Sequence, residues 1–113
     1  MKSKEQIIID NLVQKTTLLV FRFGCDTKNY RLLNLLPLTA TELEETLMLS
    51  PMPTNKRIND LMGIGLIYRE KSGAKIKLTN LGKVLIQFVE QTKADVEKEL
   101  IIMAGGTDES RKD

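Results

Sequence analysis

Apolar positions predict long amphipathic helices at both ends of the chain. Over residues 4–23 apolar side chains recur every three or four positions, and the same spacing returns over residues 80–103. The stripe of the first helix is Ile8, Leu12, Leu19 and Phe23. The stripe of the last helix is Leu81, Leu85, Phe88, Thr92, Val96, Leu100 and Met103. Together these faces hold more apolar surface than one small core covers.

Three shorter helices are expected between them. The first is capped by Asp26 or Thr27 and is closed by Pro37; the second opens with Thr39 and Glu42, which have the spacing of a capping box. The third is led by prolines and runs roughly over residues 53–62. The residues expected inside are Tyr30, Leu33 and Leu36, then Ala40, Leu43 and Leu47, then Ile58, Leu61 and Met62.

A period-two alternation follows and predicts a two-stranded hairpin. Leu66 and Tyr68 are expected to face the core from one strand, and Ile76 and Leu78 from the other, with the turn at Ser72-Gly73. Thr79 or Asn80 then caps the last helix. The predicted fold is mainly α with a small β-hairpin, in one domain over residues 1–104 followed by a disordered tail at 105–113.

A short capped helix, a Pro-led helix and a hairpin in this order form a helix-turn-helix with a wing. The segments "LTATEL", "INDLMGIGLI" and "IKLTNLG" resemble the winged helix-turn-helix of the MarR, ArsR and PadR groups of prokaryotic regulators, especially compact archaeal ones. The resemblance covers about residues 30–90, with the winged core at 30–79. It implies binding to double-stranded DNA and pairing of the terminal helices across a two-fold axis.

Candidate DNA contacts follow from this arrangement. Side chains of a recognition helix reach base edges in the major groove, and a basic wing contacts phosphates or the minor groove. The recognition helix offers Met52, Pro53, Lys56, Arg57 and Asn59, on a side whose centre is Pro53, Lys56 and Asp60. The wing offers Arg69, Lys71, Lys75 and Lys77.

The charge distribution supports this interpretation. Residues 50–83 hold seven basic and two acidic residues, a net +5, whereas the whole chain is only +2. A basic patch on the helix and wing is what a phosphate-binding surface requires. Lysines on an exposed hairpin are also common in soluble domains without this function, so the patch has weight only together with the architecture.

The wide apolar faces of the terminal helices predict a homodimer. The interface residues expected are Ile8, Leu12, Leu19, Leu85, Phe88, Val96 and Leu100. The alternative is that the two long helices pack on each other within a monomer.

Other classes are disfavoured by what the chain lacks. With no histidine and one cysteine, the usual zinc sites and Ser-His or Cys-His pairs cannot be assembled, and no Gly-rich phosphate loop is present, so we expect no enzyme, no metal and no cofactor. Cys25 is expected to be a small semi-buried residue, with redox sensing a minor possibility. No apolar run reaches the length of a membrane span, which predicts a cytoplasmic protein with no membrane partner.

Three functions remain open. The first is a sequence-specific transcriptional regulator. The second is a winged helix that grips another protein, and the third is an architectural protein that binds duplexes of any sequence.

Overall fold

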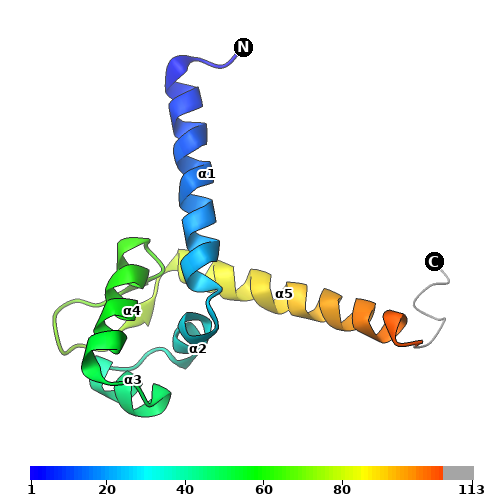
Figure 1. The fold of residues 1–113 in the computed structure, drawn as a ribbon. Coiled ribbons are helices and arrows are strands. Elements are labelled where there is room, and N and C mark those ends of the chain that lie inside the picture. Colours follow the sequence, from blue (N-terminus) through cyan, green and yellow to red (C-terminus); the bar gives the residue numbers. More distant parts are fainter. Residues whose placement is uncertain (106–113) are drawn as a thin grey trace.

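A computed structural model of the chain describes residues 1–105, and within them it contains five helices and one two-stranded hairpin (Figure 1). The elements are α1 (Lys4–Gly24), α2 (Thr27–Leu35), α3 (Ala40–Leu47), α4 (Pro51–Gly63), β1 (Ile67–Tyr68), β2 (Lys77–Leu78) and α5 (Asn80–Met103). The expectation of a mainly α fold with a small hairpin is confirmed. The predicted disordered tail lies, apart from Gly105, outside the described residues.

Polar side chains fix where most of these helices begin. Ser3, Asp26, Thr39 and Thr79 each accept a hydrogen bond from a backbone N–H of the first helical turn, at the starts of α1, α2, α3 and α5. Thr39 and Glu42 form the complete capping box that their spacing predicts. The Pro-led helix α4 begins two residues earlier than expected, at Pro51, because proline is well suited to the first helical position.

The core lies between α2, α3, α4 and the hairpin. Its most deeply buried side chains are Leu32, Leu33, Leu43, Ile58, Leu61, Leu66, Ile67 and Ile76. Only the last turns of α1, through Val20, and the first turns of α5, through Leu85, extend into it. The terminal helices are therefore anchored to the core by one end each.

In the first strand of the hairpin, the side chains that face the core differ from the predicted ones. Ile67 is buried while Tyr68 is 44% exposed, so the expectation that Tyr68 packs on the core was wrong. Leu66 precedes the strand, because its N–H donates to the carbonyl of Leu61 at the end of α4. The alternation of buried and exposed side chains in β1 therefore starts at Ile67, one residue later than predicted. The strands pair antiparallel, Ile67 with Leu78, and a bridge from Ile76 to Leu38 attaches the hairpin to the segment before α3.

The two terminal helices leave the core in different directions, at a wide angle to each other (Figure 1). We call residues 4–19 of α1 and 86–103 of α5 the two arms. The radius of gyration is 18.3 Å, against about 13 Å for a compact domain of this length. The alternative in which the long helices pack on each other within one monomer is therefore wrong.

Candidate nucleic-acid interface

The outward face of α4 is a polar strip at helical spacing. Met52, Asn55, Lys56 and Asn59 are all exposed and border a shallow groove on this face. Met52 is the most prominent, with 83% of its surface exposed. Asn55 is absent from the candidates that the sequence provides, although its positions three after Met52 and four before Asn59 put it on the same face.

Three of the predicted contacts, Met52, Lys56 and Asn59, lie together on this strip, but its centre differs from the expected one. Pro53 borders a different groove, on the side of α4 that faces α1 and α2, and Lys56 and Asp60 lie between the two and border both. The Asp60 carboxylate accepts a hydrogen bond from the Lys56 ammonium at 3.3 Å, which partly neutralises the one cation of the strip. The strip is therefore rich in amide groups and has little net charge.

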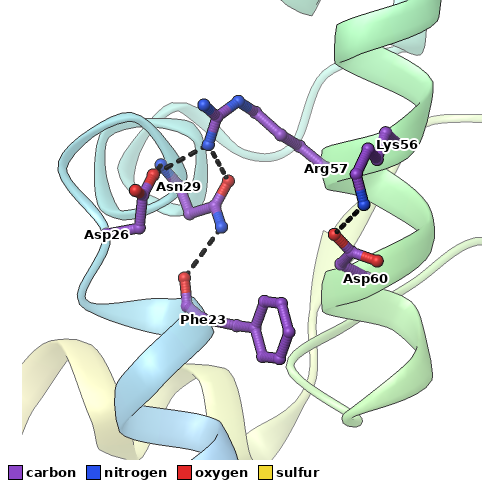
Figure 2. A network of polar contacts seen from close by, with 6 residues as sticks. All are labelled: Phe23, Asp26, Asn29, Lys56, Arg57 and Asp60. Carbon is purple, nitrogen blue, oxygen red and sulfur yellow. Dashed lines mark hydrogen bonds and ion pairs between the residues drawn. The ribbon is translucent and has the colours of Figure 1, made fainter.

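Arg57 is turned away from the strip. Figure 2 shows its guanidinium reaching from α4 to the start of α2, where Nη1 donates to Asp26 Oδ2 at 2.7 Å and to Asn29 Oδ1 at 2.8 Å. Only 27% of the Arg57 side chain is exposed. The predicted contact Arg57 is thus outside the groove that Asn59 borders, and its guanidinium is occupied within the protein.

The hairpin beside α4 carries the exposed cations. Lys71, Lys75 and Lys77 are exposed, and Arg69 is half-buried. Hydrogen bonds from the backbone N–H and the hydroxyl of Thr39 are the main cause of the lowered pKa of Glu42. The positive charge of Lys75 adds to this effect, so Lys75 lies near the start of α3. Of the seven basic residues in the 50–83 stretch, only Lys56 and Arg57 take part in ion pairs within residues 1–105.

The residues expected at a dimer interface divide into three groups. Ile8, Leu12, Phe88, Val96 and Leu100 are exposed on the arms, and Leu19 is half-buried at the base of α1. The expectation that Leu85 lies at the interface was wrong. Leu85 is 4% exposed and packs in the core, because its side chain, near the start of α5, fits against Gly24 of α1.

An apolar groove lies in the angle between the two arms. Its lining residues are Leu12, Val13, Thr16, Thr17, Val20, Phe21, Leu81, Val84, Leu85 and Phe88. Val13 is 59% exposed and was missed as an interface candidate, although its spacing from Ile9 places it beside the predicted stripe. The groove joins the apolar faces of α1 and α5 into one surface.

Cys25 is solvent-exposed, so the expectation of a semi-buried residue was wrong. The partial desolvation of its thiol raises the pKa, which lowers the thiolate fraction and disfavours redox sensing. Within residues 1–105, no group of three or more carboxylate or thiol side chains is placed to hold a metal ion.

In the described part of the chain, none of the helices combines the length and apolar character needed to cross a membrane. Comparison with protein-family models, curated proteins and solved structures found no match to this chain.

Proposed function

We propose that the chain is a DNA-binding transcriptional regulator of the winged helix-turn-helix type, active as a homodimer in the cytoplasm. In this proposal α3 and α4 are the helix-turn-helix and the hairpin is the wing. The single observation that carries it is the placement of an exposed amide-rich face of α4 next to a hairpin whose lysines are exposed.

The two surfaces suit different parts of a duplex. Asn55 and Asn59 can each make paired hydrogen bonds to adenine in the major groove, and Met52 can lie against a thymine methyl group. Lys71, Lys75 and Lys77 can contact phosphates on either side of the groove. Base reading is thus assigned to α4 and electrostatic attachment to the hairpin.

The arms supply the reason for a homodimer. Their exposed apolar surface is continuous through the groove between α1 and α5, and a monomer of this shape leaves it in water. A two-fold dimer through the arms buries it and presents two copies of α4 to one face of a duplex, about 34 Å apart.

A titration of duplex DNA at several salt concentrations tests the proposal. The probe is a labelled duplex pool with a randomised centre, followed by fluorescence anisotropy, and the variant is Lys75→Ala/Lys77→Ala. We expect the slope of log affinity against log salt to become less steep by about 3.6, since the dimer loses two lysines from each protomer and each lost phosphate contact contributes about 0.9. Lys4→Ala/Lys15→Ala, which removes the same charge from α1, away from α4 and the hairpin, is the matched control and should keep the wild-type slope.

The other outcomes distinguish the alternatives. Absence of binding at low salt contradicts the proposal and favours a surface for another protein. Selection from the pool separates the remaining two functions, since a regulator enriches one sequence and an architectural protein enriches none.

A further inference from the structure

The end of α1, the start of α2 and the middle of α4 are joined by one hydrogen-bond network (Figure 2). Arg57 of α4 donates to Asp26, the N-cap of α2, and to Asn29 in the first turn of α2. Asn29 Nδ2 in turn donates to the carbonyl oxygen of Phe23 in the last turn of α1, at 2.8 Å. The network therefore ties α4 to the base of the α1 arm through α2.

Burial makes this network costly to break. Asn29 is 4% exposed, and both polar atoms of its side-chain amide are occupied: the oxygen accepts from Arg57 and the nitrogen donates to the Phe23 carbonyl. Loss of the guanidinium leaves a buried amide oxygen without that donor and removes a hydrogen bond between charged groups. The Arg57 guanidinium therefore makes its hydrogen bonds within the protein.

The second arm is tied to the same helix. Tyr30, the neighbour of Asn29, donates its hydroxyl to Glu90 of α5 at 2.8 Å. Asn29 and Tyr30 therefore connect α2 to the base of α1 and to the α5 arm, while Arg57 connects it to α4. α2 therefore links α4 to both arms, in addition to the direct packing of α4 on α1.

We propose that Arg57 is a positioning residue that sets the placement of α4 relative to the arms, and hence the distance between the two half-sites that a dimer recognises. The inference rests on the proposed function of DNA binding by an arm-paired dimer. In this inference Arg57 does not contact DNA. It instead fixes the orientation in which the other candidate residues of α4 reach the major groove.

Variants of adjacent residues separate positioning from phosphate contact. We would compare Arg57→Gln with Lys56→Gln, which removes the same charge from the outward face of α4. The probes are duplexes carrying two copies of the half-site selected from the pool, with centres about 10 base pairs apart and then shifted in steps of one base pair. Affinity is measured at each spacing and at several salt concentrations.

For Arg57→Gln we expect an unchanged salt slope and a loss or shift of the preferred spacing. For Lys56→Gln we expect the salt slope to become less steep by about 1.8, one lost contact in each protomer of the dimer, with the preferred spacing unchanged. Arg57→Lys retains the charge but cannot hold two acceptors in one planar geometry, so it should also lose the spacing preference and serves if Arg57→Gln fails to fold.

Three results overturn the inference while leaving the proposed function standing. The first is a salt slope of Arg57→Gln that is less steep by about 1.8 with the preferred spacing preserved. The second is an equal loss of affinity at every spacing, and the third is a wild-type protein that binds all spacings alike. A wild-type protein that does not bind DNA at all instead removes the proposed function itself.

Discussion

The rings of Phe21 and Phe88 meet edge to face where α1 and α5 diverge, with their centroids 5.5 Å apart. Both rings border the apolar groove between the arms. They also border another apolar groove, which runs along α5 and is lined by Val96 and Leu100. The pair is thus a ridge between two apolar grooves. It makes the exposed surfaces of the two arms one continuous patch.

A charge placed in this patch should dissociate the proposed dimer. In Val13→Asp the carboxylate would be buried without a partner at the interface, which is strongly unfavourable. We expect a monomer by sedimentation equilibrium and at least a roughly tenfold loss of DNA affinity, since a single half-site contact remains.

Leu18→Asp is the matched control for this variant. Leu18 is as exposed as Val13, 61% against 59%, and lies on the same helix, but it does not border the groove. It should remain dimeric. A dimer in both variants would show that the arms are not the interface.

A methyl group at Gly82 should destabilise the fold. An added Cβ would collide with the carbonyl oxygen of Leu66, and a backbone atom cannot move aside as a side chain can. We expect Gly82→Ala to lower the free energy of unfolding by about 1–3 kcal/mol in a urea titration. Gly63→Ala has open space around the new methyl group and should be neutral or stabilising by up to about 1 kcal/mol. Equal effects of the two variants would contradict the close approach of α5 to Leu66.

Acid should weaken the fold through Asp26. The N–H of Asn29 chiefly, with the Arg57 guanidinium, lowers the pKa of the Asp26 carboxyl below its usual value. A carboxyl with a lowered pKa in the folded state stabilises the fold above its unfolded pKa, near 4, and this stabilisation is lost as the pH falls through the folded value. Asp26→Asn should therefore have a lower Tm than the wild type at pH 7, and the two melting curves should converge in strong acid. A constant difference at every pH would contradict this role of the charge.

The thiol of Cys25 should react slowly. Its raised pKa keeps the thiolate fraction at neutral pH below that of an ordinary cysteine, and the thiolate is the nucleophile. We expect iodoacetamide to alkylate the folded protein more slowly than the urea-unfolded chain at pH 7. A faster reaction of the folded protein would reopen the question of redox sensing.

The sequence predicts well those features that depend on neighbouring residues. The capping box of Thr39 and Glu42 and the cap at Thr79 are local hydrogen bonds, so their spacing alone indicates where α3 and α5 begin. Burial of Leu43, Ile58 and Leu61 follows from helical periodicity because each helix turns one apolar side to the core.

Features that depend on how elements meet were not predictable in this way. Arg57 and Leu85 have the types and spacing of a DNA contact and an interface residue. Their roles are set by the start of α2 and by Gly24, which lie far from them in the sequence. Which side chains of β1 face the core likewise depends on the hydrogen bond that holds Leu66 to the end of α4. Asn55 could have been found from its helical spacing, but the outward centre of α4 is fixed only by the side that packs on α2 and α3.

The arms have a consequence for how the protein responds to its own abundance. Most of the stability of a protein helix comes from tertiary packing of its apolar face, and each arm continues well beyond the core that anchors it. In the proposed dimer, the core folds in a first-order step, while the order of the arms depends on the concentration of the chain. Dilution would then fray the arms while the core stays folded, and the paired form that engages two half-sites would accumulate only when enough protein has been made.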